Sequence, residues 1–220
     1  SRRKRKMSPP LELAYVADPL CSWCWGFAPV LDRLLAGAAA HLPFRLVMGG
    51  LRPGPYAQPV DAGMLHHLRA HWEAVCERTG QPFKFDYFDH PGPVYDTEPS
   101  ARAVVAMRRL APAREYPFFL RIQEAFYRRN IDCTSPSQLE GLAHLEPIDP
   151  GRFRALYRDP ETLALTRKDY DDARRMGIHS FPAVVLQGGG LCVPVTLGYR
   201  ELEPVEHALS AAMDTLGGRG

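Results

Sequence analysis

The sequence contains little that would place it in a membrane or on a nucleic acid. No apolar run among its 220 residues reaches the roughly 18 residues that a membrane-spanning helix needs. The formal net charge is only +2, and because Arg2–Lys6 contribute +5, the rest of the chain carries −3. That mildly acidic body lacks the basic face by which proteins bind nucleic acids. Neither a membrane nor a nucleic acid is therefore an expected partner.

A secretory signal is also missing. The basic residues at 2–6 are followed by Ser8-Pro9-Pro10 and a short strand-like run, where a signal peptide would carry a longer apolar segment and a cleavage site. We expect a cytoplasmic location for this chain. We also expect residues 1–10 to be a basic, disordered leader.

Cysteine is scarce, and only one pair is closely spaced. The five cysteines stand at positions 21, 24, 76, 133 and 192, so their number is odd and no disulfide framework is predicted. A zinc site would need a second C-x-x-C or equivalent ligands, and His67 and His71 fit a solvated helix face better. We predict no metal and no other cofactor. Cys76 and Cys133 are either separate thiols or a second redox pair.

The order of apolar patterns predicts an α/β fold. Residues 11–17 and 44–48 are short, β-prone runs, and a helical pattern from Trp23 to about Ala40 lies between them, which is typical of a βαβ unit. The sequence ends in a helical pattern, two β-prone runs around Gly188–Gly190 and a closing helix. The intervening helices are expected over 62–78, 98–110, 116–129, 135–144 and 151–157, with an extended segment at 84–87.

A thioredoxin-like domain with an inserted helical domain has this order of elements. We assign residues 11–55 to its first part, 56–157 to the helical insertion and 158–217 to its second part.

The chemistry is expected from Cys21-Ser22-Trp23-Cys24, where the first strand meets the first helix. Residues three apart at a helix start face the same side, so their sulfurs can approach bonding distance. The helix N-terminus stabilises a thiolate through its free N–H groups and dipole. We therefore predict that Cys21 is the nucleophile and that Cys24 resolves the mixed disulfide.

A second segment is expected beside this motif. Phe181-Pro182 precedes an apolar strand, and we predict a cis peptide bond there. A cis turn next to the dithiol would present the backbone of Phe181 to an incoming peptide, which could pair with it as an added strand. Trp23 is predicted to be exposed and to help Phe181 bind substrate.

Four segments in order resemble the FrnE-like branch of the DsbA family. They are 18–27 (DPLCSWCWGF), 49–54 (GGLRPG), 95–99 (YDTEP) and 177–182 (GIHSFP). The resemblance implies a thioredoxin domain with an inserted helical domain, and disulfide oxidoreductase or isomerase activity. It also implies that Cys21 and Cys24 form the redox pair, that Pro182 is the cis-proline and that residues 95–98 face the active site.

The sequence departs from well-known relatives in two places. Those relatives have a buried carboxylate six residues before the first cysteine, where this chain has Tyr15. Asp18 is nearer, and we expect it to cap the turn into the helix. The dipeptide between the cysteines is Ser-Trp, without the histidine or proline of those relatives. The intervening dipeptide is one control of the reduction potential, so the direction of the reaction stays open.

The expected partners are proteins that carry a disulfide or thiol, with glutathione or a reductase as a possible electron partner. Two other functions stay open. One is glutathione-dependent isomerisation of small aromatic molecules, known on the same architecture, although those enzymes typically lack the cysteine pair. The other is a chaperone or metal-buffering protein that uses the helical block.

Overall fold

A computed structural model describes residues 10–217 of the chain, so most of the predicted basic leader lies outside the described residues. Its main sheet has the strand order β2-β1-β5-β6. The strands are β1 (Glu12–Ala17), β2 (Phe44–Met48), β5 (Ala183–Gly188) and β6 (Leu191–Leu197). β1 runs parallel to β2 and antiparallel to β5, and β5 and β6 form the predicted hairpin.

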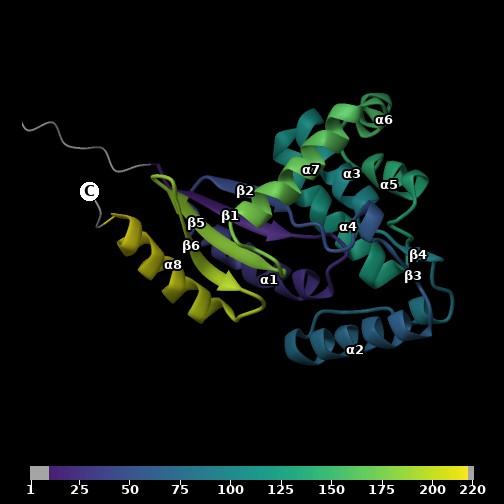
Figure 1. The fold of residues 1–220 in the computed structure, drawn as a ribbon, viewed down its shortest axis with the longest axis horizontal. Helices are drawn as coiled ribbons and strands as arrows, with labels where there is room; N and C mark the ends of the chain where they lie inside the picture. Colours follow the sequence, from purple (N-terminus) through teal and green to yellow (C-terminus); the bar gives the residue numbers. More distant parts are fainter. Residues whose placement is uncertain (1–9, 218–220) are drawn as a thin grey trace, which may run out of the picture.

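Alternate residues of β1 point to opposite faces of the sheet, and helices cover both faces (Figure 1). Leu13 and Tyr15 belong to the larger core, together with residues of α1 (Ser22–Ala36) and α8 (Leu202–Gly217). Val16 faces the other side and packs with Ala173 of α7 (Pro160–Arg175). Three layers with this strand order form a thioredoxin-like fold, which confirms the predicted fold class.

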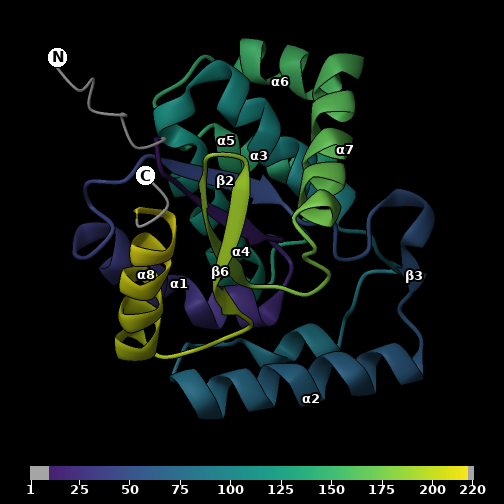
Figure 2. The ribbon, with the colours of Figure 1, turned by 60° about the vertical axis from the view of Figure 1, so that its left-hand side comes forward.

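A helical block lies between β2 and α7 along the chain. Its helices are α2 (Ala62–Thr79), α3 (Glu98–Leu110), α4 (Glu115–Arg129), α5 (Pro136–Ala143) and α6 (Pro150–Arg158). The 3-10 helices Gly54–Tyr56, Phe85–Phe88 and Pro112–Arg114 and the short strands β3 (Gln58–Pro59) and β4 (Val94–Tyr95) connect them. α2 runs along one side of the molecule, beyond α1 (Figure 2). Within residues 10–217, no helix combines the length and apolar character that crossing a bilayer requires.

Local signals explain most element boundaries, and one prediction was wrong. Asp61 accepts a hydrogen bond from the N–H of Met64 at the start of α2, and Gly80 ends that helix in the left-handed region. Residues 84–87 were predicted to be extended, but Phe85–Phe88 form a 3-10 helix. The rings of this segment gather around the buried Trp72, so tertiary packing decides its conformation.

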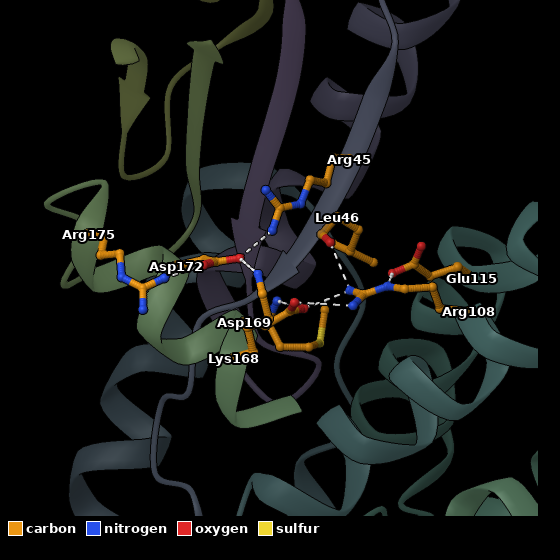
Figure 3. Close-up of polar contacts among 9 residues, drawn as sticks. Arg45, Leu46, Arg108, Glu115, Lys168, Asp169, Asp172 and Arg175 are labelled. Atoms are coloured by element: carbon orange, nitrogen blue, oxygen red, sulfur yellow. Dashed lines mark hydrogen bonds and ion pairs between the residues drawn. The ribbon is translucent and has the colours of Figure 1, made fainter. Parts of the chain in front are cut away.

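An ion-pair cluster joins the helical block to the sheet (Figure 3). Arg108 of α3 binds the carboxylate of Asp169 on α7 through both terminal nitrogens, at 2.7 and 3.1 Å, and also donates to the carbonyl of Leu46 on β2. Glu115 accepts from the same guanidinium, and the backbone N–H of Met48 donates to Asp169. These bonds tie α3, α4 and α7 to the end of β2, close to the loop that follows it.

Candidate active site

Cys21 forms the start of α1. It is the N-cap residue, and its sulfur accepts the backbone N–H of Cys24 at 3.3 Å. The same sulfur lies 3.7 Å from the carbonyl oxygen of Phe181, to which its S–H donates. Two segments that are 160 residues apart in the sequence thus meet at one thiol. The sulfur occupies the position where free helix N–H groups stabilise a thiolate.

Cys24 lies one turn into α1 and is completely buried. Burial raises the pKa of its thiol well above the usual value, and the neighbouring Cys21 raises it further. A backbone hydrogen bond from Asp18 opposes this shift in part. Cys21 retains 6% exposure, whereas Cys24 has none.

The loop before β5 forms the second side of the site. The Phe181–Pro182 peptide bond is cis, and the carbonyl of Pro182 accepts the N–H of Gly198 at 2.7 Å. The ring of Phe181 lies against Gly49, where a Cβ atom would stand only 2.2 Å from it. Glycine at this position therefore allows the loop after β2 to contact the loop that faces Cys21.

Asp18 joins two of these loops. Its fully buried carboxylate accepts the N–H of Leu20 and the N–H of Leu51, each at 2.9 Å. Burial raises the pKa of Asp18 to about 6, although these hydrogen bonds act in the opposite direction. The prediction that Asp18 caps the turn is confirmed, while the N-cap of α1 itself is Cys21.

Residues 95–98, which belong to the insertion, hold the same loops through hydrogen bonds. The hydroxyl of Tyr95 donates to the carbonyl of Leu20, next to Cys21, at 2.6 Å. Thr97 exchanges two hydrogen bonds with the backbone of Arg52, and Asp96 accepts the N–H of Gly54. The helical block thus holds the backbone on both sides of the dithiol.

A groove of about 720 Å³ lies beside the dithiol. Its lining residues are Trp23, Ala74, Glu77, Arg78, Ser180, Phe181, Gly198 and Tyr199. The rings of Trp23 and Tyr199 are 5.9 Å apart, and the guanidinium of Arg78 lies over the ring of Tyr199. α2 supplies the far wall, so the groove combines an aromatic floor with one cation and one carboxylate.

The comparison with protein families gives one match that covers nearly the whole described chain. The profile of the DSBA-like thioredoxin domain matches residues 12–210. The chain belongs to this DSBA-like family.

Two solved structures illustrate the likeness. A candidate protein disulfide isomerase from Nitrosomonas europaea is 33% identical, with a TM-score of 0.86 over 94% of this chain and 98% of that one. The cytosolic disulfide reductase DsbM from Pseudomonas aeruginosa is 28% identical, with a TM-score of 0.72 over 93% of this chain and 99% of that one. DsbM has also been solved with glutathione.

Curated relatives are more distant. The ClpXP adapter protein SpxH of Halalkalibacterium halodurans is 23% identical over 189 residues, which are 83% of this chain. The chain spans 60% of that relative's length.

The predicted site residues of this DSBA-like chain fall in one place. Trp23 and Phe181 line the groove, the sulfur of Cys21 lies 3.7 Å from the carbonyl oxygen of Phe181, and Cys24 is completely buried beside them in the chain. Trp23 is half-buried, so the prediction that it is exposed was too strong.

The cysteines form no disulfide within residues 10–217, where all five thiols are free. Cys133 is buried and donates to the carbonyl of Ile122, whereas Cys192 is half-buried on the edge strand β6. No group of three or more potential metal ligands occurs among the described residues.

Two parts of the site carried weak sequence signals. Tyr95 could be placed near the dithiol only through the family resemblance, because its contact with Leu20 spans 75 residues. Gln123 and Tyr127, which α4 buries behind the dithiol, had no signal beyond their position in a helical pattern.

Proposed function

We propose that the protein is a thiol–disulfide oxidoreductase that acts through Cys21 and Cys24. The observation that carries the proposal is the position of the Cys21 sulfur. It caps α1, accepts the N–H of Cys24 and faces the backbone of Phe181. A sulfur held by helix N–H groups and open to a neighbouring groove suits attack on a disulfide.

The proposed reaction has two exchange steps. The Cys21 thiolate attacks one sulfur of a substrate disulfide, which forms a mixed disulfide and releases the other sulfur as a thiolate. Cys24 then loses its proton and attacks Cys21. The Cys21–Cys24 bond forms, the bond to the substrate breaks, and the second substrate sulfur leaves as a thiolate that takes up a proton. The enzyme is oxidised by two electrons and the substrate is reduced.

The same steps in reverse would oxidise a substrate. If a second thiol of the substrate, instead of Cys24, displaces Cys21 from the mixed disulfide, the substrate is isomerised. The neighbours DsbM and the Nitrosomonas protein support reduction and isomerisation respectively. We favour reduction, because glutathione is present with DsbM and could return electrons to the Cys21–Cys24 disulfide. This proposal includes glutathione, or a reductase, as the electron partner.

The substrate site is proposed to be the groove between Trp23, Phe181 and Tyr199. Its aromatic floor suits the apolar side chains of an unfolded protein that carries a disulfide. The backbone of Phe181 would pair with the extended peptide, while Glu77 and Arg78 on α2 bound the other side. Pro182 fixes the loop that presents this backbone.

Three finer assignments belong to the same proposal. The FrnE-like branch is supported by the four motifs given above. A cytoplasmic location is supported by the likeness to DsbM, which is a cytosolic disulfide reductase. The division into 11–55, 56–157 and 158–217 is supported by the order of elements, because β2 ends at Met48 and α7 begins at Pro160.

The experiment compares turnover of a small model disulfide with glutathione as donor, for wild type, Cys21→Ser, Cys24→Ser and Cys192→Ser. We expect Cys21→Ser to lose all activity above background, and the half-buried Cys192 on β6 to be dispensable. Equal turnover of wild type and Cys21→Ser would show that the dithiol is not the reacting group.

A further inference from the structure

In the resolving step of the proposed function, Cys24 must react as a thiolate, although its surroundings disfavour the charged form. Cys24 is fully buried, and both burial and the proximity of Cys21 raise the pKa of its thiol. Four titratable side chains interact electrostatically with the Cys24 thiol. They are Asp18 and Cys21, which precede it in the chain, Tyr15 on β1 and Tyr127 on α4. None of these four carries a positive charge. A thiolate at Cys24 therefore depends on hydrogen-bond donors.

Tyr15 offers one such donor. It stands on β1, is 1% exposed, and its hydroxyl has no hydrogen-bond partner by geometry among the described residues. Burial raises the pKa of this hydroxyl well above its usual value, and the nearby Cys24 thiol is the next largest cause. The ring of Tyr15 also lies 6.0 Å from that of Phe27, one turn along α1 from Cys24. The hydroxyl is thus a neutral donor near the start of α1, with no hydrogen-bond partner within residues 10–217.

Tyr127 on α4 offers a second donor. Its ring stacks on Trp25, the residue after Cys24, with centroids 6.2 Å apart. Its hydroxyl is also buried and unpaired among the described residues. The stack on Trp25 places Tyr127 beside the first turn of α1. Burial raises the pKa of its hydroxyl, and Tyr95, Cys21 and Cys24 raise it further.

A third buried polar side chain, Gln123, belongs to α4. It lies one turn from Tyr127 and one turn from Phe119, whose ring meets Tyr15 edge-on at 6.1 Å. Gln123 is completely buried, and both atoms of its amide lack a partner within residues 10–217. An unpaired buried polar atom costs roughly 1–3 kcal/mol, and native proteins rarely keep several in one place without a use.

We infer that Tyr15 and Tyr127 stabilise the Cys24 thiolate during resolution. As Cys24 loses its proton to solvent, the two O–H groups turn toward its sulfur and donate to the developing charge. The Cys24 sulfur then attacks Cys21, and the substrate leaves.

The test follows the mixed disulfide with glutathione, quenched by acid and detected by intact mass, across a range of pH. The inference rests on the proposed function, and the test separates formation of the mixed disulfide from its decay. We expect Tyr15→Phe to leave formation unchanged and to slow decay about threefold. Losing a donor to a charged sulfur raises the pKa of that thiol by about one unit, which lowers the thiolate fraction about tenfold, while the more basic thiolate attacks about threefold faster. The pH profile of decay should shift upward by the same unit, and Tyr127→Phe should act in the same direction.

Tyr157→Phe is the matched control. Tyr157 on α6 also has a buried, unpaired hydroxyl, but its ring lies under Arg102, within the helical block. The inference is overturned if decay is unchanged in both Tyr15→Phe and Tyr127→Phe, or if Tyr157→Phe slows it equally. If wild type forms no mixed disulfide at all, the proposed function fails, and with it this use of the tyrosines.

Discussion

Asp18 shows how one side chain supports the geometry of the dithiol. Its two carboxylate oxygens each accept a backbone N–H, one from Leu20 in the cysteine loop and one from Leu51 in the loop after β2. Neither loop has a strand or helix at this point to satisfy its N–H groups. Burial of the carboxylate raises its pKa to about 6, and that shift links the stability of the site to pH.

The free energy of unfolding should fall as pH rises through the range between 3.8 and about 6. An acid whose pKa is raised by folding keeps its proton in the native state after the unfolded state has lost it. Ionising it in the native state then costs free energy, on the order of 2–3 kcal/mol over the whole window. Urea unfolding of wild type across this range measures the effect.

Asp18→Asn provides the comparison, because an amide does not titrate. The variant should be less stable than wild type at every pH, since the amide can accept only one of the two N–H groups. The stability difference between the two proteins should shrink as pH rises through the window. A constant difference would mean that Asp18 does not titrate there.

At the scale of elements, the Arg108–Asp169 pair joins the insertion to the sheet. Asp169 is nearly buried, with its side chain 5% exposed, and it also holds the N–H of Met48 at the end of β2. The carboxylates of Asp169 and Glu115 raise the pKa of Arg108 against the effect of burial, so its charge is stabilised. The contact fixes α7 and α3 beside the loop that begins at Gly49.

We expect Arg108→Met to lower the free energy of unfolding by about 3–5 kcal/mol, because it leaves Asp169 as a buried charge without its cation. Arg158→Met is the control. Arg158 pairs with Glu140 at 3.3 Å, but its side chain is 69% exposed, and a surface pair of this kind contributes about 0–1 kcal/mol. Denaturant unfolding of both variants measures the difference. Similar losses for the two would contradict the role given to the cluster.

Elements with strong local signals could be predicted from the sequence. The turn at Gly189–Gly190 has φ of +58° and +78°, as the glycines indicate, and α3 spans the predicted residues 98–110. The segment at 84–87 could not be predicted, since its conformation depends on the packing of its own rings against Trp72, which lies on α2.

At the scale of the whole molecule, the site is made where the thioredoxin-like domain meets its insertion. The order of elements and the position of Cys21 at a helix start could be predicted from the sequence, because both follow from patterns of neighbouring residues. The contacts of Tyr95 with Leu20 and of Tyr127 with Trp25 could not, because they depend on how the insertion folds back. These contacts distinguish the environment of this dithiol from a bare C-x-x-C motif.

The most direct test of the account is the intact mass of Cys24→Ser after incubation with oxidised glutathione at neutral pH. The account predicts one glutathione per chain, attached to Cys21, because the resolving thiol has been removed. Wild type should instead carry the internal Cys21–Cys24 disulfide without an adduct. An adduct that is absent from Cys21, or that occurs equally on Cys192, would contradict the assignment of Cys21 as the nucleophile.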